Sequence, residues 1–373
     1  MLKSFFNKVF EESLLVIAAV LTVAFSIFIK KPDLLAVDYG VIAFLCVLML
    51  ISLGLEQECF LDKIAVTVID KNHTEQRIAV AMMATTAVIA MLVTNDVALI
   101  TVVPITLIIA RKGGFDPFRI IVLETAAANF GGSLTPMGNP QNIFLYHYYR
   151  LEPLGFLRAM LPFLVVCLVI SFFVIFGLRS RRIEFEDEKA DIRSRAKVLI
   201  YLALLALVLL TVFRIVDIRL TFGITVLTVL LTDRKLFRNL DFSLLATFVL
   251  FFVIIDQISA VDAVRDTAAA VAGSRLNTFL ASALFSQAIS NVPAAILNAP
   301  FTQEGYALVT GVSVGGFGTL IASLANLISY KFYASQYQDR RMSRKYLIYF
   351  HKINLLYLAV LIAVFSALYR RGL

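Results

Sequence analysis

A polar stretch at residues 131–142 interrupts a long apolar part of the chain and could bind ions or small polar solutes. Its side chains are neutral, so their oxygens suit a monovalent cation and their N–H groups suit an anion. The candidate binding residues of this stretch are Ser133, Thr135, Gly138, Asn139 and Asn142. Such groups at membrane depth are typical of a transporter that binds a substrate and a coupling ion.

The same stretch cannot continue as a regular helix. Pro136 and Pro140 each remove a backbone donor and clash with the preceding turn. The glycines at 131, 132 and 138 each cost about 1 kcal/mol relative to alanine in a helix. In lipid, non-helical backbone is tolerated only where it is buried in protein or lines a wet cavity. The stretch therefore predicts a broken transmembrane helix whose loop carries the candidate ligands.

A second copy of this pattern occurs at residues 315–326, at a constant offset of 184 residues. In this copy, Gly131, Gly132, Thr135, Asn139 and Asn142 are matched by Gly315, Gly316, Thr319, Ser323 and Asn326. Upstream, Thr-Asn-Asp at 94–96 is matched by Ser-Asn-Val at 290–292, and Glu-Gln at 56–57 is matched by Asp-Gln at 256–257. Matches in the same order indicate a duplicated unit. They add Thr94, Asn95, Asp96, Ser290 and Asn291 to the candidate ligands.

Asp96 breaks the symmetry of the two copies, because its counterpart is Val292. A carboxylate within the membrane is costly and is functional by default. It could hold Na⁺ together with Asn95 and Asn142, or it could carry a proton; alternatively, it caps a hairpin tip that is exposed to water. For the whole set, the simpler alternative is that Asn, Ser and Thr only cap the breaks and satisfy backbone groups.

Glu124 is a second candidate proton site. It lies about two turns before Gly131 on an apolar segment. Two interpretations stay open at this point: Glu124 exchanges a proton, or it pairs with a basic group such as Arg77 or Arg111.

Composition identifies a membrane protein. The 373 residues are 60% hydrophobic and 16% charged, with a mean hydropathy of +0.86, which exceeds what a soluble core requires. The net charge of +8 is spread over short loops, as the positive-inside rule predicts, and does not indicate a nucleic-acid partner. Cysteines and histidines are too scattered for a metal site, and no nucleophile or paired-Asp motif indicates an enzyme. We expect no cofactor other than Na⁺ or H⁺ as a coupling ion.

The apolar runs that position these residues predict an all-α polytopic membrane protein with two inverted-topology repeats, each with a re-entrant hairpin and a broken transmembrane helix. The first repeat is expected over 1–179, with a hairpin at about 77–111 and a broken helix at about 118–150. A charged linker at 180–197 follows. Residues 198–373 then hold one extra helix, a hairpin at about 276–300 and a broken helix at about 304–336. An interfacial arm is expected in each repeat, at 56–76 and around 262–275.

Positive charge predicts the orientation. With a cytoplasmic N-terminus and re-entrant hairpins, 24 of the 34 Lys and Arg residues fall in cytoplasmic segments. The extra helix turns the second repeat upside down, so the hairpins enter from opposite sides and Asn95 should lie near Asn291 at mid-membrane. We expect a multi-pass protein of the bacterial inner membrane, surrounded by the lipid bilayer.

These motifs resemble those of the ion transporter superfamily with the citrate-transporter-like domain, which includes arsenite permeases, Na⁺/H⁺ antiporters and divalent-anion/sodium symporters. Thr-Asn-Asp-Val-Ala-Leu at 94–99 is similar to the hairpin tip of the permease and antiporter branches, where the symporter branch has Ser-Asn-Thr. Gly-Asn-Pro-Gln-Asn at 138–142 departs from the commoner Gly-Thr-Pro-Pro-Asn, and Val292 replaces a hydroxyl residue. The chain is most similar to uncharacterised bacterial inner-membrane members with both motifs. The resemblance implies a homodimer whose transport domain moves as an elevator against a scaffold.

We therefore predict a secondary active transporter, not an enzyme, that moves a small anionic or oxyanion-like solute coupled to Na⁺ or H⁺. No Arg or Lys within the membrane is placed as an anion clamp, so helix dipoles and amides would bind the anion. The alternative is a Na⁺/H⁺ antiporter in which Asp96 exchanges the two ions. A passive channel is a further alternative, and the duplicated sites argue against it.

Overall fold

Helices make up the fold throughout the residues that the computed structural model describes, which are 13–69, 74–178, 191–262, 273–337 and 339–371. No strand occurs in these ranges. Six helices within them are long and apolar enough to cross a membrane: α3 (Tyr39–Gln57), α5 (Glu75–Leu92), α9 (Pro153–Phe176), α10 (Arg195–Val212), α12 (Phe242–Ser259) and α18 (Arg340–Arg370). The all-α, polytopic class predicted from the sequence is confirmed.

The first repeat contains a hairpin followed by a broken helix. The hairpin consists of α5 and α6 (Asn95–Lys112), and the broken helix consists of α7 (Phe118–Leu134) and α8 (Pro140–Tyr148). Thr94 caps α6, and Asn139 caps α8 directly before a proline at the first helical position. The remaining elements of this repeat are α2 (Ser13–Phe28), the short η1 (Leu34–Ala36), α3, the amphipathic α4 (Phe60–Ile69) and α9.

The second repeat has the same order of elements. The hairpin consists of α14 (Arg275–Ile289) and α15 (Asn291–Asn298), and the broken helix consists of α16 (Gly305–Gly315) and α17 (Leu324–Gln336). Its other elements are α11 (Ile218–Asp233), η2 (Arg234–Asn239), α12, η3 (Ala299–Phe301), η4 (Leu320–Ala322) and α18. The extra helix α10 begins at Arg195, inside the predicted linker 180–197. Most of that linker and most of the arm expected around 262–275 lie outside the described residues.

Helices of the two repeats pack reciprocally. The second hairpin arm of each repeat, α6 or α15, packs against the second half of the other repeat's broken helix, α17 or α8. Likewise α3 packs against α11, and α12 packs against α2. Such exchange of equivalent partners is what a two-fold relation between inverted repeats produces.

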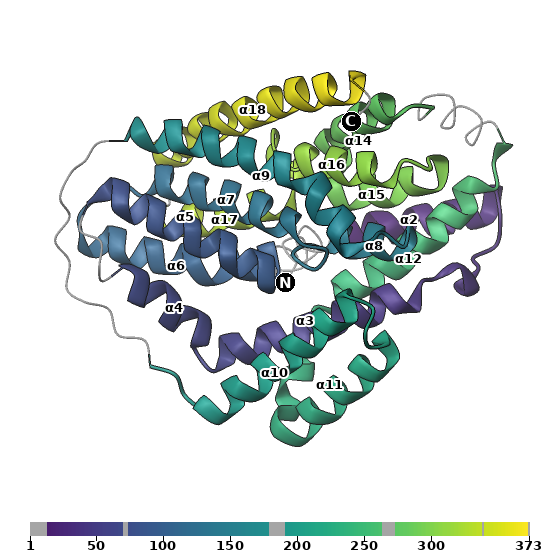
Figure 1. Cartoon of the computed structure of the whole chain (residues 1–373), viewed down its shortest axis with the longest axis horizontal. Coiled ribbons are helices and arrows are strands. Elements are labelled where there is room, and N and C mark those ends of the chain that lie inside the picture. Colours follow the sequence, from purple (N-terminus) through teal and green to yellow (C-terminus); the bar gives the residue numbers. More distant parts are fainter. Residues whose placement is uncertain (1–12, 70–73, 179–190, 263–272, 338, 372–373) are drawn as a thin grey trace.

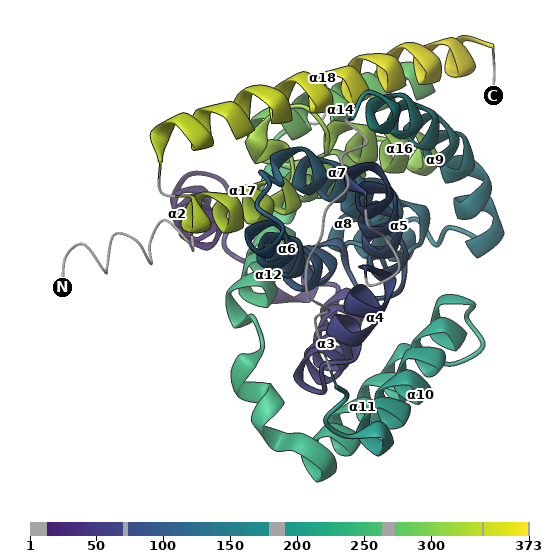
Figure 2. The same cartoon turned by 90° about the vertical axis from the view of Figure 1, so that its left-hand side faces the viewer.

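The helices form two groups that touch along a limited boundary. We call α2, α3, α10, α11 and α12 the scaffold group, and the two hairpins, the two broken helices, α9 and α18 the hairpin group. Figure 2 shows α10 and α11 on the side of α3 that faces away from the hairpin group. In Figure 1, α9 and α18 run along the opposite edge of the molecule from α10 and α11. The boundary contacts come mainly from α3 with α8 and from α12 with α15, while α4 links α3 to the first hairpin.

Glycine permits the tight packing of each hairpin on its broken helix. A Cβ at Gly131 would lie 2.7 Å from the Cα atom of Ala87, and a Cβ at Gly315 would lie 3.0 Å from the Cα atom of Ala283. These four residues are equivalent in the two repeats. The repeated glycines therefore set the distance between hairpin and broken helix, and so position the loops described next.

Candidate functional site

Both hairpin tips and both broken-helix loops meet at one small cavity. Its volume is about 40 Å³, where about 10–15 Å³ holds one water molecule, so roughly three waters or one partly hydrated ion fit. The polar residues that line it are Asn95, Asp96, Gln141, Thr247, Ser290, Asn291 and Ser323. Asn95 and Asn291 thus lie on the same cavity, as the repeat predicted. An apolar wall formed by Leu244, Phe248 and Phe251 of the scaffold helix α12 closes it.

The first hairpin tip is fixed to the first loop by backbone and side-chain hydrogen bonds. The Asn95 amide donates to the Gly138 carbonyl at 2.9 Å, and the Asn95 Oδ1 atom accepts from the Asp96 amide at 3.0 Å. Thr94 Oγ1 accepts from the Val97 amide at 3.4 Å, as an N-cap does. The tip therefore holds Asp96 in a defined position in the first turn of α6.

Asp96 is the only ionisable residue among the described residues that line this cavity. Its Oδ1 atom is buried and has no hydrogen-bond partner in the described part of the protein. A buried carboxylate oxygen without a partner is costly unless a cation or a proton neutralises it. The geometry thus favours a cation or a proton at Asp96 over a purely structural cap.

Ser290 at the second hairpin tip has a strained backbone. Its φ is 74° and its ψ is 154°, a region that only glycine enters readily. Its counterpart Thr94 is extended, with φ of −157°. Ser290 Oγ lies 3.5 Å from Asn291 Oδ1, so the tip forms only a weak internal hydrogen bond. Strain of this kind is concentrated at ligand sites and switch regions.

The two broken loops are closed by equivalent hydrogen bonds. Asn142 Nδ2 donates to the Thr135 carbonyl at 2.9 Å, and Asn326 Nδ2 donates to the Thr319 carbonyl at 3.1 Å. The hydroxyls of Thr135 and Thr319 donate to the last turn of their own hairpin's first arm, at Met91 (2.8 Å) and Gln287 (3.1 Å). These four side chains lie outside the cavity and satisfy loop backbone; their direct binding of a ligand stays a prediction.

Ser133 and Asn139 also act within the first loop. Asn139 Oδ1 accepts from the Asn142 amide at 3.0 Å, and Asn139 Nδ2 lies 3.4 Å from Ser133 Oγ. Gly138 contributes its carbonyl to Asn95, as described above. Of the residues predicted from the sequence, Asn95, Asp96, Ser290, Asn291 and Ser323 line the cavity, and the others form the structure behind it.

Asn129 joins the two repeats and was not singled out from the sequence. Its Nδ2 atom donates to Asn326 Oδ1 at 2.9 Å, and its Oδ1 atom accepts from Ser323 Oγ at 3.1 Å. The equivalent pair, Ser313 and Asn142, does not form this bridge, because serine is one bond shorter than asparagine. A lone asparagine one turn before Ser133 on an apolar helix was the only sequence signal.

Glu124 lies away from the cavity and is completely buried. Thr106 donates a hydrogen bond to its Oε1 atom, and its Oε2 atom has no partner among the described residues. The alternative interpretation, pairing with Arg77 or Arg111, is therefore not observed among the described residues. Its role as a proton site stays a prediction.

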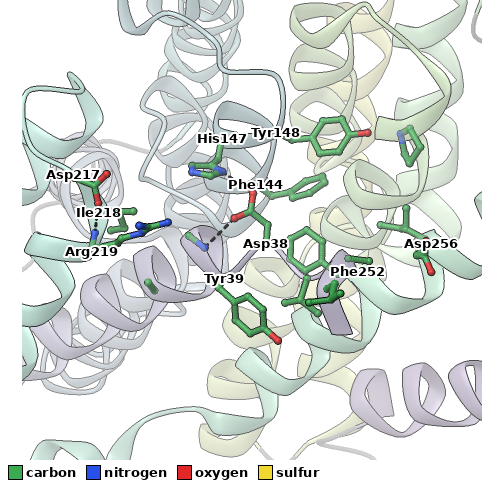
Figure 3. A pocket seen from close by; sticks show the side chains of 17 residues that line it. Asp38, Tyr39, Phe144, His147, Tyr148, Asp217, Ile218, Arg219, Phe252 and Asp256 are labelled. Atoms are coloured by element: carbon green, nitrogen blue, oxygen red, sulfur yellow. Dashed lines mark hydrogen bonds and ion pairs between the residues drawn. The ribbon is translucent and has the colours of Figure 1, made fainter. Parts of the chain in front are cut away.

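A larger hollow lies where α8 meets the scaffold group. Two adjoining cavities of about 720 and 630 Å³ share His147 and Asp217 in their walls. Figure 3 shows Asp38, at the start of α3, pointing toward His147, near the end of α8. His147 Nδ1 lies 2.7 Å from Asp38 Oδ2. Burial alone would raise the pKa of Asp38, but hydrogen bonds from His147 and from the Val41 and Gly40 amides lower it below its usual value.

Metal chemistry is not indicated in the described ranges. No group of three or more His, Cys, Asp or Glu side chains there could hold a metal ion. Sodium remains compatible with the cavity, because neutral oxygens and one carboxylate are suitable ligands for a hard cation.

Comparison with known proteins agrees with this architecture. The sequence profile of the CitMHS family, described as citrate transporter, matches residues 8–306. The uncharacterized transporter MJ0456 of Methanocaldococcus jannaschii is 33% identical over 297 residues, covering 79% of this chain and 80% of that protein. The inner membrane protein YbiR of Escherichia coli is 30% identical over 319 residues, covering 84% of each. The YdaH transporter of Alcanivorax borkumensis has a similar fold, with a TM-score of 0.56 at 12% identity, covering 87% of this chain and 84% of that one.

Proposed function

This chain belongs to the citrate transporter family, and we propose that it is a secondary active transporter that moves a small anionic or oxyanion-like solute coupled to Na⁺ or H⁺. The observation that carries the proposal is the convergence of both hairpin tips and Ser323 of the second loop on one cavity that contains Asp96. Broken helices that meet near the bilayer centre are where inverted-repeat transporters bind substrate and coupling ion.

Charge decides the order in which ligands bind. The described lining contains one carboxylate and no basic side chain, so an anion that entered first would face an uncompensated negative charge in a poorly hydrated site. We infer that Na⁺ or H⁺ neutralises Asp96 first. The amides of Asn95, Asn291 and Gln141 and the N-termini of α6, α8 and α15 then supply N–H groups and favourable dipoles for the anion.

The division into two helix groups supports alternating access of the elevator type. In this proposal the hairpin group carries the cavity across the membrane past α12 and α3, while the scaffold group stays fixed. We further propose a homodimer with a cytoplasmic N-terminus in the inner membrane; the charge distribution supports that orientation.

A Na⁺/H⁺ antiporter is the second candidate, and the cavity itself favours it. A volume of about 40 Å³ suits a partly hydrated ion better than a carboxylate of citrate size. In that case Asp96 would bind Na⁺ and H⁺ alternately, and no organic solute would be required.

One experiment separates the two candidates. Purified protein is first screened for thermal stabilisation by carboxylates, oxyanions, Na⁺ and Li⁺, and it is then reconstituted into vesicles under imposed Na⁺ or H⁺ gradients. Solute-dependent, gradient-driven uptake supports the symporter. Proton flux that is driven by Na⁺ without any solute supports the antiporter. Flux that is independent of every imposed ion gradient would exclude both the symporter and the antiporter and would indicate a channel.

A further inference from the structure

The hairpin group is attached to the scaffold group at one membrane face by several polar contacts. His147 of α8 pairs with Asp38 before α3 at 2.7 Å. The Tyr146 hydroxyl donates to the Val212 carbonyl at the end of α10, and Arg214 donates to the Leu151 carbonyl at 2.7 Å. Movement of the hairpin group relative to the scaffold would break all three contacts.

The hydrogen bond between His147 and Asp38 lies where it can open and close. The imidazole packs against the first turn of α3, where a Cβ atom at Gly40 would lie only 3.0 Å from His147 Nε2. The side chains are 46% and 29% exposed, so water reaches both partners and replaces the lost contact at low cost. The adjoining cavity leaves room for the imidazole to withdraw.

The second repeat carries a basic residue and a carboxylate at the equivalent positions. At the loop offset of 184 residues, His147 corresponds to Lys331. Asp38 is the N-cap of α3, and Asp241 is the N-cap of the equivalent helix α12. Because the repeats are inverted, Lys331 and Asp241 belong to the opposite membrane face.

The second pair is open in this structure. Asp241 Oδ1 accepts a hydrogen bond from the Leu244 amide at 2.9 Å, as a helix cap. Lys331 is exposed, and among the described residues it forms no ion pair. One repeat is thus latched and the other is not, although each has a basic residue and a carboxylate at these positions.

We propose that His147–Asp38 and Lys331–Asp241 are alternating latches, of which only one is closed at a time. The proposal rests on the elevator movement proposed above. When the hairpin group moves to the opposite position, the His147–Asp38 pair separates and Lys331 reaches Asp241. Each pair stabilises one end state. None of the four residues lines the central cavity, although the Asp241 carboxylate acts electrostatically on Asp96.

The test uses cysteine pairs in a variant in which Cys46, Cys59 and Cys167 are replaced by serine. Asp38→Cys with His147→Cys forms the first pair, and Asp241→Cys with Lys331→Cys forms the second. Each is treated in membranes with a short bis-thiosulfonate linker, which spans roughly the length of an ion pair. Asp38→Cys with Lys331→Cys is the matched control, because these positions belong to opposite faces.

We expect both true pairs to cross-link and the control pair not to cross-link. Each cross-link should reduce uptake or ion flux at least tenfold, and reduction should restore it. In a variant with all four cysteines, closing one pair should prevent closing of the other. Formation of both cross-links in the same molecule would overturn the proposal of alternating latches. So would the absence of the second cross-link in a protein that still transports. If the cross-links alternate but the protein moves only Na⁺ and H⁺, the latches stand and only the proposed anionic solute is overturned.

Discussion

Ser290 has a backbone conformation that differs strongly from that of its counterpart Thr94 in the other repeat. Its φ of 74° costs about 1–3 kcal/mol for a residue with a side chain. Ser290→Gly should therefore raise the melting temperature of the purified protein, by an amount that corresponds to about 1 kcal/mol. Since Ser290 lines the cavity, we expect slower transport together with the higher stability, which thermal unfolding and vesicle uptake measure.

Thr94→Gly is the matched control at the first tip. Thr94 has an ordinary extended backbone and caps α6, so glycine relieves no strain there and removes the capping side chain at a cost of roughly a few tenths of a kcal/mol. The melting temperature should fall. A rise in both variants, or a fall in both, would show that strain at Ser290 does not explain the result.

Asp38 makes the His147–Asp38 contact dependent on pH. Its pKa is raised by burial but lowered more strongly by His147 and by the Val41 and Gly40 amides, and the net shift is downward. The carboxylate therefore stabilises the fold fully above the pKa of an unfolded Asp, about 4, and this contribution is lost as the pH falls through the lower, folded value. Asp38→Asn keeps the capping oxygen but removes the charge. The stability difference between wild type and Asp38→Asn should therefore shrink as the pH falls below the pKa of an unfolded Asp, about 4.

Other charged residues near His147 also affect the stability of the protein and therefore need a control. Asp38, Arg150, Arg214, Asp217 and Arg219 line the cavities around it. A matched Asp217→Asn variant also retains its helix cap but removes a charge that does not pair with His147. A stability difference for Asp38→Asn that persists unchanged at pH 3, or one that Asp217→Asn reproduces, would contradict the assignment.

Single residues were predictable where a local pattern marks them. Asparagine and aspartate between two apolar arms identified the hairpin tips, and proline with glycine identified the loops. Asn129 and the His147–Asp38 pair could not be found in this way. Asn129 is an isolated polar residue on an apolar helix, and His147 and Asp38 are 109 residues apart in sequence.

At the level of elements, hairpin packing depends on glycine. A Cβ atom at Gly131 would lie 2.5 Å from the carbonyl oxygen of Ala87, so α5 and α7 would have to separate. Gly131→Ala should destabilise the protein by about 1–3 kcal/mol, the usual cost of overpacking, and should impair transport because the first loop shifts. Thermal unfolding and uptake in vesicles measure both effects.

Gly223→Ala provides the control within another helix. Gly223 lies inside α11, and a Cβ atom there would meet nothing within 4 Å. Alanine should stabilise that helix by up to about 1 kcal/mol. Equal destabilisation by the two substitutions would mean that close packing at Gly131 is not the cause.

Helix breaks and bounds follow from short-range chemistry, but helix partners do not. Pro140 at the first position of α8 and the cap at Asn139 explain where that helix begins. The packing of α6 on α17 and of α15 on α8 depends on the whole arrangement of the repeats. The repeat pattern predicted that these elements converge, and the structure identifies which helices meet.

For the whole molecule, the inverted repeats were predictable because two motifs recur in order and one extra helix separates them. The apolar wall that α12 contributes to the central cavity was not predictable, because Leu244, Phe248 and Phe251 look like ordinary lipid-facing residues in the sequence. The polar boundary between α8 and the scaffold group was equally hidden. Both features lie at the boundary between the two helix groups, which no local pattern encodes.

The most direct test of a cation-coupled site at Asp96 is the accumulation ratio of the transported solute in vesicles under an inward Na⁺ or H⁺ gradient. Wild-type protein should accumulate the solute above its external concentration, and an ionophore should abolish this. Asp96→Asn retains the size of the side chain but removes its charge, so the variant should keep its melting temperature and lose accumulation. Accumulation by Asp96→Asn equal to that of the wild type would contradict the account.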